Sequence, residues 1–353
     1  AECATLCDMT TPTPPRPPLK DVAALSGVSE PTVSRVLNGR EGVAAATRDR
    51  VVDALERLGY TDIPDPQRPR RKVIGLVCGE LQNPVFASFV HHISTELGRT
   101  GNLTTVAVTD RDLAPEERCI AELEHAGVDG IIFIGGRHSE VDGDRDHYRQ
   151  LFDRGRPMVF VNGAKLDLPS PHVWCDERAG ARKAVSHLIA LGHTSIGCLL
   201  GSPRYVPTER FIAGYRSVMA DFGLPEPEGA IIDATFTLEG GRAGATRLLD
   251  RGITAMLAGN DLMALGAVLA SRTHASAGQV AVVGYDGTEF TAFTDPPLTT
   301  LRQPFAEMAR LVADAIVSEV DGSERFRDHY MFEPQLVVRE SSHPLAHHAV
   351  AGR

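Results

Sequence analysis

Hydrophobic and polar positions divide the chain into two regions with different periodicities. Near the N-terminus, segments 20–26, 30–37 and 47–58 carry apolar residues three or four positions apart, which predicts three short amphipathic helices. From residue 73 onward, apolar runs of strand length alternate with amphipathic segments, as in parallel sheets buried between helices. These runs are VIGLVCG, LTTVAVT, DGIIFIG, PMVFVN, SIGCLLG, TAMLAGN and QVAVVGY. The pattern predicts a three-helix head followed by two doubly wound α/β lobes.

The junction between the first two helical segments predicts a helix-turn-helix. Gly27 can adopt the positive φ of a sharp turn, and Ser29 can cap the next helix through its hydroxyl. Val33 and Leu37 then share an apolar face, which leaves a polar face opposite. The third segment has Ala44 where a Ser or Thr cap is expected, so we expect its start to fray. Three short helices with a Gly turn also occur in proteins that do not bind DNA.

The string DVAALSGVSEPTVSRVLNG favours the DNA-binding alternative. It resembles the head of the LacI/GalR family of transcription regulators, whose D-V-A, G-V-S and T-V-S-R-V-L-N elements are all present. The resemblance continues through GVDGIIF, HLIALGHTSIGCLLG, GNDLMALGA, VAVVGYDG, DPPLTTLRQPFAEMA and EPQLVVRES, and so covers nearly everything from residue 19 to 341. Within the family, ELQNPVF, DHYRQL and FTLEGGRAGATRLL are most similar to bacterial repressors of maltose operons.

The resemblance implies a domain organisation. We expect a disordered leader at 1–18, a helix-turn-helix DNA-binding domain at 19–61, a Pro/Arg-rich linker at 62–72, a two-lobed ligand-binding and dimerisation domain of the periplasmic-binding-protein-like type at 73–340, and a tail at 341–353. By the same analogy three crossovers join the lobes, and the first lobe comprises 73–161 with a return segment after residue 303. The ligand would lie between the lobes, where strand carboxyl ends converge.

The resemblance also assigns the DNA contacts. The recognition helix would offer Glu30, Pro31, Thr32, Ser34 and Arg35 to the major groove, with Ser29 and Asn38 near phosphates. Arg35 is the strongest candidate for a bidentate contact to guanine, although outside this motif a surface arginine paired with an acid would be the simpler interpretation. The partner would be a near-palindromic double-stranded operator bound by a homodimer.

The linker departs from the family. Typical members continue with a short helix that wedges a leucine into the minor groove, whereas here TDIPDPQRPRRK follows Tyr60 and Pro69 holds the leucine's place. Its prolines disfavour a regular helix, so we expect an extended linker. Arg68 and Arg70, with Arg71 and Lys72, are candidate phosphate contacts. A solvated basic spacer is the alternative.

A second set of positions matches the family's effector contacts. They are Phe86, Asn162, Asn260, Asp286, Gln303 and Phe305, to which we add Arg210 and Trp174 as candidate ligand-binding residues. Amides and a carboxylate can hold vicinal hydroxyls, and aromatic rings can stack on a pyranose, which favours a sugar over a purine. A maltose-type sugar is the leading interpretation, and a non-sugar metabolite the alternative.

Three details qualify this set. Asn260 and Asp286 directly follow apolar strands, where we see little structural purpose for a polar residue, so they are the strongest candidates. Asp261 is expected to cap the next helix, and Phe305 also fits a core position. The family's usual arginine is replaced by Phe211, with Arg210 one residue earlier, and its Gly-Tyr-Asp-Asp reads Gly-Tyr-Asp-Gly, which puts the arginine clamp in doubt.

Charge distinguishes the two regions further. The net charge is -10, yet residues 19–72 hold ten Lys or Arg against eight Asp or Glu. A slightly basic end on an acidic body suits local contact with DNA. The six cysteines lack C-x-x-C spacing and clustered histidines, so we expect free thiols, no metal and no cofactor.

Other function classes lack their signatures. No strand leads into G-x-G-x-x-G or a G-x-x-x-x-G-K-[ST] loop, and no catalytic triad is evident, so we do not expect an enzyme. A solute-binding protein would share the two lobes but needs export, and the N-terminus lacks the apolar stretch of a signal peptide. No apolar run is long enough to span a bilayer, so we expect a cytoplasmic protein.

Overall fold

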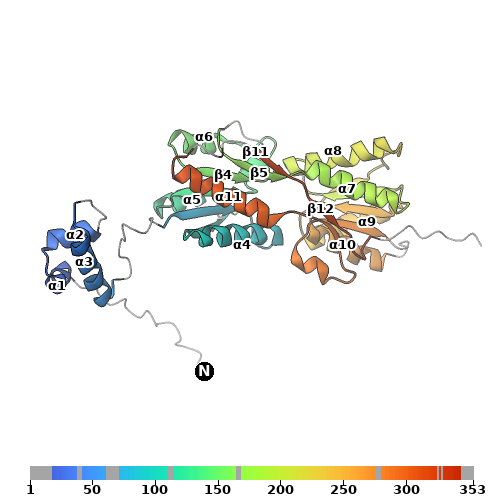
Figure 1. The fold of residues 1–353 in the computed structure, drawn as a ribbon. Helices are drawn as coiled ribbons and strands as arrows, with labels where there is room; N and C mark the ends of the chain where they lie inside the picture. The colour runs from blue at the N-terminus through green and yellow to red at the C-terminus, as the bar shows by residue number, and fades with distance from the viewer. Residues whose placement is uncertain are drawn as a thin grey trace, which may run out of the picture. The chain divides into compact units, whose positions relative to one another are not determined.

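The structure is a computed structural model that describes residues 18–37, 42–60, 71–109, 114–163, 168–274, 280–323, 326 and 329–342. The chain forms two compact units, a head that ends at Arg71 and a body that begins at Lys72 (Figure 1). The expected leader up to residue 17, linker residues 61–70 and the tail from residue 343 lie outside the described residues.

The head consists of three helices packed around a small apolar core. They are α1 (Leu19–Ser26), α2 (Glu30–Leu37) and α3 (Ala45–Arg57). Gly27 ends α1 with φ 68°, as predicted for the turn. Val22, Val33, Val51 and Leu55 are fully buried between the helices. Ala44, at the N-cap position of α3, supplies no side-chain hydrogen bond, so this helix lacks the usual cap.

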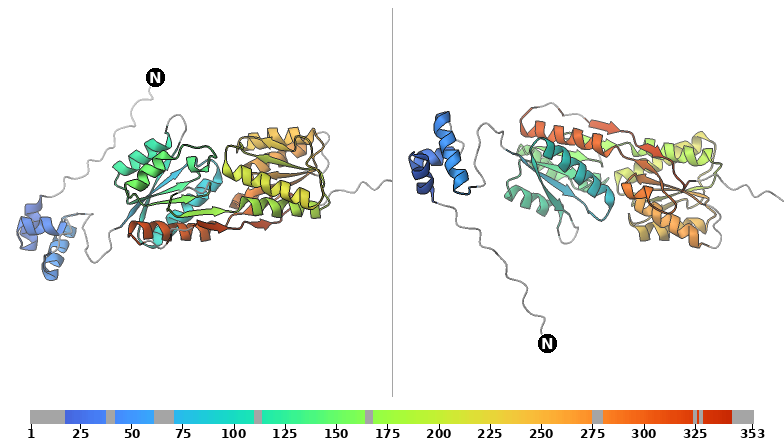
Figure 2. Two further views of the ribbon diagram at one scale, coloured as in Figure 1. Left: turned by 90° about the horizontal axis from the view of Figure 1, so that it is seen from above. Right: turned by 60° about the horizontal axis from the view of Figure 1, so that its bottom comes forward.

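Lobe 1 is a six-stranded parallel sheet in the order β11-β5-β4-β3-β1-β2. Its elements are β1 (Val73–Cys78), α4 (Pro84–Arg99), β2 (Leu103–Val108), α5 (Glu116–His125), β3 (Gly130–Ile134), η1 (Arg137–Ser139), α6 (Asp146–Asp153), β4 (Met158–Val161), β5 (His172–Cys175), α11 (Phe305–Val320) and β11 (His329–Phe332). Helices α4 and α11 lie side by side against one apolar core, and a second core lies between the sheet and helices α5 and α6 (Figure 2). Both faces of the sheet are therefore covered, which makes the lobe doubly wound.

Lobe 2 has the sheet order β12-β10-β9-β8-β6-β7, parallel except where β12 pairs antiparallel with β10. Its elements are α7 (Glu177–Ala190), β6 (Ile196–Leu200), α8 (Val206–Asp221), β7 (Ile231–Asp233), α9 (Leu238–Leu249), β8 (Ala255–Ala258), α10 (Asp261–Thr273), β9 (Ala281–Asp286), η2 (Glu289–Ala292), β10 (Thr299–Arg302) and β12 (Gln335–Val337). Helices α7 and α8 bound one core, and α9 and α10 bound the other.

The chain passes between the lobes three times, after β5, after β10 and after β11, as the family analogy implied. Lobe 1 is longer than expected, because β5 at His172–Cys175 completes its sheet. Helix α11 then returns from lobe 2 and places Phe305, Met308 and Val312 in the core of lobe 1. Each lobe is therefore completed by chain that is distant in sequence.

All seven apolar runs form strands, but one prediction about them is wrong. Strand β2 is not buried on both faces, because it lies at the edge of its sheet. Leu103, Val106 and Val108 are 40–50% exposed. Strands β5, β7, β10, β11 and β12 were not predicted.

Lys72 also differs from its expected place in the linker. Its ammonium group lies 2.6 Å from Asp321 Oδ1, and its backbone N–H donates to Asn102 Oδ1 at 3.2 Å. These bonds fix Lys72 at the start of the body. We therefore remove it from the candidate phosphate contacts.

Candidate functional site

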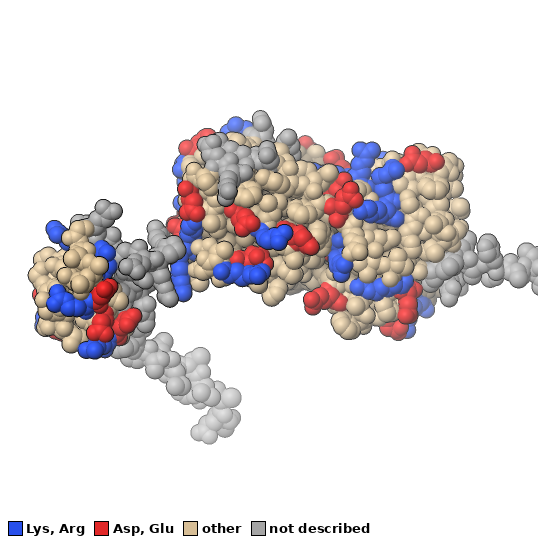
Figure 3. Space-filling view, in the orientation of Figure 1, with Lys and Arg blue, Asp and Glu red and all other residues tan. Residues whose placement is uncertain are grey.

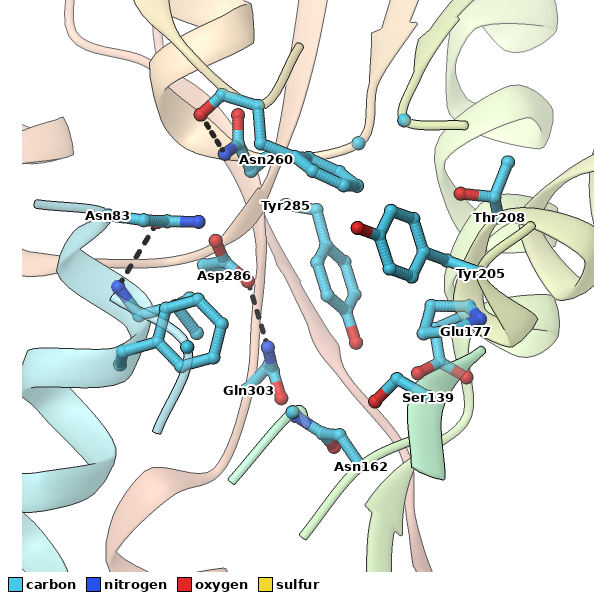
Figure 4. Close-up of a pocket in the computed structure, with 18 of the residues that line it drawn as sticks. Asn83, Ser139, Asn162, Glu177, Tyr205, Thr208, Asn260, Tyr285, Asp286 and Gln303 are labelled. Carbon is cyan, nitrogen blue, oxygen red and sulfur yellow. Dashed lines mark hydrogen bonds between the residues drawn. The ribbon is translucent and has the colours of Figure 1, made fainter. Parts of the chain in front are cut away.

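A cavity of about 330 Å³ lies between the two lobes, where the carboxyl ends of both sheets meet (Figure 4). We call it the central cavity. Its described polar wall consists of Glu80, Asn83, Ser139, Asn162, Glu177, Tyr205, Thr208, Asn260, Tyr285, Asp286 and Gln303, and its larger apolar side chains are Val85, Phe86, Phe89, Ile134, Leu200, Phe211 and Phe236. A mostly apolar cavity with a few convergent polar groups is typical of a small-molecule site.

Asp286 and Gln303 form the polar floor contributed by lobe 2. The Gln303 Nε2 donates to Asp286 Oδ1 at 2.9 Å, and both side chains are buried. The Gln303 Oε1 is buried and has no hydrogen-bond partner in the part of the chain that the structure describes. Burial and the charge of nearby Asp261 raise the pKa of Asp286 well above its usual range. The floor therefore offers a carboxyl group with a raised pKa and an unused amide oxygen.

Asn260 has a structural purpose that the sequence analysis missed. Its Oδ1 accepts from Met263 N at 2.8 Å and caps α10, while its Nδ2 donates to Phe236 O at 3.1 Å. The predicted cap, Asp261, instead accepts hydrogen bonds from Thr288 N, Thr288 Oγ1 and Thr300 Oγ1. Burial raises the pKa of Asp261 to about 6, although these hydrogen bonds act to lower it. Asn260 still lines the cavity, but its side chain is already bonded at both ends.

Asn162 joins two strands at the lobe 1 side of the cavity. Its backbone has φ 60°, which is uncommon for a non-glycine residue. Its Oδ1 accepts from Cys175 N at 3.3 Å, and its carbonyl oxygen lies 2.8 Å from His172 Nε2. Burial lowers the pKa of His172 to about 3, so a neutral imidazole donates this bond. Asp286, with φ 108°, is the other described non-glycine residue with positive φ. Both conformations occur in the cavity wall, where backbone strain often marks a functional site.

Glu177 is a buried acid that the sequence analysis did not single out. Its carboxylate lines the cavity and is 3.1 Å from Arg210 Nη1. Burial raises the pKa of Glu177 to about 7, and Arg210 opposes that shift. The Arg210 guanidinium also lies 5.8 Å from the centre of the Trp174 ring. Phe211, at the family's arginine position, lines the cavity itself.

Three predicted ligand-binding residues lie outside the cavity wall. Arg210 and Trp174 stand behind Glu177, where the Trp174 ring also contacts His172. Phe305 is 8% exposed and packs edge-on against Phe89 at 4.9 Å in the core of lobe 1. By contrast, Phe86, Asn162, Asn260, Asp286 and Gln303 all line the cavity.

Gly287 explains the departure from Gly-Tyr-Asp-Asp. It has φ 71°, and a Cβ there would lie 2.4 Å from Arg302 Cα. An aspartate would need backbone movement at this turn. The turn after β9 in this chain therefore requires glycine at position 287.

The head presents the other candidate site on α2. Glu30, Pro31 and Arg35 are exposed on its outer side. The Ser29 carbonyl accepts from Thr32 N and Val33 N, and the Ser29 hydroxyl lies 3.0 Å from the Thr32 hydroxyl. Arg35 forms no ion pair with the described residues of the head. Asn38, Arg68 and Arg70 lie outside the described residues.

Surface charge and thiols add little to either site. The viewed face of the body shows acidic and basic side chains side by side rather than a continuous acidic surface (Figure 3). Cys78, Cys119, Cys175 and Cys198 are buried free thiols. Within the described ranges, no His, Cys, Asp or Glu cluster could hold a metal ion, and no helix has the length and apolar character of a membrane span.

Comparison with known proteins finds matching families for both the head and the body. Residues 18–62 match the model for bacterial regulatory proteins of the lacI family, and residues 185–342 match a periplasmic binding protein-like domain. The transcriptional regulator MalR of Streptomyces coelicolor is 40% identical, over 92% of this chain and 96% of its own length. The CelR–cellobiose complex has a TM-score of 0.68 at 31% identity, covering 93% of this chain and all of that one. The lac repressor dimer bound to operator and the anti-inducer ONPF has a TM-score of 0.76 at 28% identity, covering 92% and 99%.

Proposed function

The chain belongs to the lacI family of bacterial regulatory proteins, and we propose that it is a repressor of a sugar-utilisation operon, controlled by a carbohydrate in the central cavity. Its relatives are transcriptional regulators, and the chain is a DNA-binding regulator and not an enzyme. We propose the repressor activity, the kind of operator and the effector.

The buried, unpartnered Gln303 Oε1 is the observation that carries the carbohydrate proposal. A buried acceptor without a donor is costly, and a ligand hydroxyl would supply that donor. Beside it lies the buried carboxyl group of Asp286, whose pKa is raised, and the cavity wall holds the Phe86 and Tyr205 rings, on which the apolar face of a pyranose can pack. A purine offers fewer hydroxyl donors to such a wall.

A maltose-type sugar is the proposed effector. The 40% identity with MalR and the maltose-repressor-like segments support it. The relative in complex with cellobiose shows that a disaccharide binds to one protein of this fold. A non-sugar metabolite remains the second candidate, supported by the apolar character of much of the wall.

We further propose that the operator is near-palindromic and that a homodimer binds it through α2. A single small head buries too little surface for tight specific binding, and two heads on adjacent half-sites combine their energies. The exposed side of α2 with Arg35 supports this assignment. The effector would contact lobe 1 through Asn162 and lobe 2 through Gln303, so its binding shifts the balance between lobe arrangements and hence DNA affinity.

The test is a binding measurement with DNA and sugar together. Operator fragments are selected from genomic DNA with the purified full chain, and their affinity is measured by fluorescence anisotropy with and without maltose, cellobiose or glucose. We expect one sugar to change operator affinity at least about tenfold. Selection of no specific fragment would contradict DNA regulation, and a response only to non-sugar metabolites would contradict the carbohydrate effector.

A further inference from the structure

A second cavity, of about 580 Å³, adjoins the central cavity. We call it the side cavity. The two cavities share Gly79, Gly135 and Tyr205 in their described walls. The two cavities are therefore adjacent, with Tyr205 in the wall of both.

The wall of the side cavity is rich in paired charges. Arg137 forms an ion pair with Glu117, and Arg204 Nη2 lies 3.8 Å from Glu140 Oε1. The Arg137 and Arg204 side chains are 38% and 42% exposed. Because each guanidinium group already has a carboxylate partner, the wall offers hydrogen bonds without a net positive charge. This disfavours a phosphate or carboxylate ligand and favours a neutral, hydroxyl-rich one.

A third carboxylate in this wall strengthens that preference. Glu116 is buried and accepts hydrogen bonds from Arg137 N, His147 Nε2 and Tyr148 Oη. These bonds oppose the desolvation of Glu116, and its pKa is lowered. The negative charge of Glu116 repels an anionic ligand in the side cavity.

Tyr205 lies in the wall that the two cavities share. The Arg204 guanidinium lies 4.6 Å from the centre of the Tyr205 ring and donates to its hydroxyl. The backbone nearby links the lobes, because Val141 N donates to Arg204 O at 2.7 Å. The side cavity is thus built from Arg137 and Glu140 of lobe 1 and Arg204 and Tyr205 of lobe 2.

We propose that the side cavity is a second sugar subsite, which binds the hexose unit next to the one in the central cavity through Arg137, Arg204 and Tyr205. The proposal rests on the carbohydrate effector proposed above and gives that effector a minimum length. Hydroxyls of the second unit accept from the guanidinium groups and donate to Glu117 and Glu140. Because both lobes line the subsite, a longer sugar bridges them at two places.

The experiment measures dissociation constants of the full chain by calorimetry with glucose, maltose, maltotriose, cellobiose and cellotriose. The variants are Arg137→Ala and Arg204→Ala, and Arg216→Ala is the control, because Arg216 is an exposed arginine paired with Glu226 and lines neither cavity. Two variants from different lobes guard against a local folding defect in either one.

For wild type and for Arg216→Ala, we expect a two- or three-unit sugar to bind about tenfold or more tightly than glucose. In Arg137→Ala this preference should fall to about threefold or less, with glucose affinity unchanged within about twofold. In Arg204→Ala the preference should fall likewise, whatever change in glucose affinity follows from the lost contact with Tyr205. If longer sugars gain nothing, or both variants keep the preference, the subsite is wrong while the carbohydrate effector stands. If none of the five sugars binds, the effector proposal fails and the subsite fails with it.

Discussion

Arg210 Nη1 lies 3.1 Å from Glu177 Oε2, and the carboxylate lines the central cavity whereas the arginine does not. The family places its arginine one residue later, at the position of Phe211. In this chain the ligand would therefore contact the Glu177 carboxyl group instead of a guanidinium group. Arg210 pairs with that carboxyl group from the side away from the cavity. This arrangement favours a neutral polyol over an anionic effector.

Glu177 predicts a pH dependence of stability. Its pKa is raised to about 7 in the folded protein from an ordinary value near 4.5, so the folded state binds the proton more tightly. The resulting stabilisation is complete below about pH 4.5 and is lost as pH rises through about 7, with a magnitude of the order of 3 kcal/mol at most. Glu177→Gln removes this titration, so its Tm relative to wild type should rise from pH 5 to pH 8. A difference in Tm that stays constant from pH 5 to pH 8 would contradict it.

Gln303 should be necessary for the sugar response. Gln303→Ala removes the unpartnered Oε1 and the bond to Asp286, so effector affinity should fall about tenfold or more, with operator affinity unchanged within about threefold. Anisotropy with and without sugar measures both.

Variants of Asn260 can separate its role as the N-cap of α10 from a role in binding the sugar. Asn260→Ala removes the cap of α10 and should cost about 1 kcal/mol of stability, whereas Asn260→Asp retains an acceptor for Met263 N. Asn260→Asp loses the Nδ2 donor to Phe236 O, so both variants should lose stability, but a lost sugar response in Asn260→Asp, with the cap acceptor kept, would assign the amide a role in binding the sugar. Retention of a full response in Asn260→Asp would limit Asn260 to capping.

Arg35 should carry sequence discrimination. Arg35→Ala is expected to lower specific operator affinity by about 10- to 100-fold and to relax selectivity at one base pair, because a bidentate contact to guanine is lost. Arg57→Ala, in the same head but paired with Asp53, is the control. Equal losses on all sequences would show that Arg35 contacts phosphate instead.

The linker arginines should add affinity without sequence preference. Changing Arg68, Arg70 and Arg71 together to Gln is expected to weaken binding to every sequence and to reduce the salt slope by up to about 3. We also expect weaker bending than with a leucine wedge, because Pro69 replaces that leucine. An unchanged slope or a strong central kink would contradict the extended basic linker.

The edge strand β2 is a candidate part of the dimer interface. Its exposed Val106 stands between Leu103 and Val108, and such an apolar edge invites pairing with another chain. Val106→Lys should shift the protein towards monomer in sedimentation at micromolar concentration, whereas Phe222→Lys, at another exposed apolar residue, should not. Equal sedimentation of both variants as dimers would place the contact elsewhere.

Sequence patterns predicted the strands at the centre of each sheet, but they missed β5 and β10, which lie one strand in from an edge, and the edge strands β7, β11 and β12. Strands β1 and β3 are continuous apolar runs because helices cover both faces of their sheet. Strand β5 was missed because it begins at the polar His172, which is buried and bonded to Asn162, and this leaves an apolar run of only three residues. Since β5 was missed, Glu177 directly after it could not be placed at a strand end. A polar residue that is buried because it bonds to one specific partner produces no periodic hydrophobic pattern in the sequence.

The cavity wall shows the same limit. Asn162, Asp286 and Gln303 could be placed because each follows a strand or matches a family position. Ser139 ends η1 and Tyr205 precedes α8, in segments next to a contact between the lobes, the bond from Val141 N to Arg204 O. Asn83 had a local signal, as an N-cap before Pro84, but capping alone does not indicate a cavity.

The path of α11 has a consequence for synthesis on the ribosome. Lobe 1 begins at β1, yet its core needs Phe305, Met308 and Val312, which are translated after nearly all of lobe 2. The cores of lobe 2 draw their fully buried residues from the stretch between Ala181 and Leu301, so they can close while lobe 1 still lacks a wall. The core of the lobe encoded first thus closes after the cores of lobe 2, although β12 joins the edge of lobe 2 later still, and a nascent chain that stalls before α11 exposes the apolar face of its α4 side to chaperones and proteases.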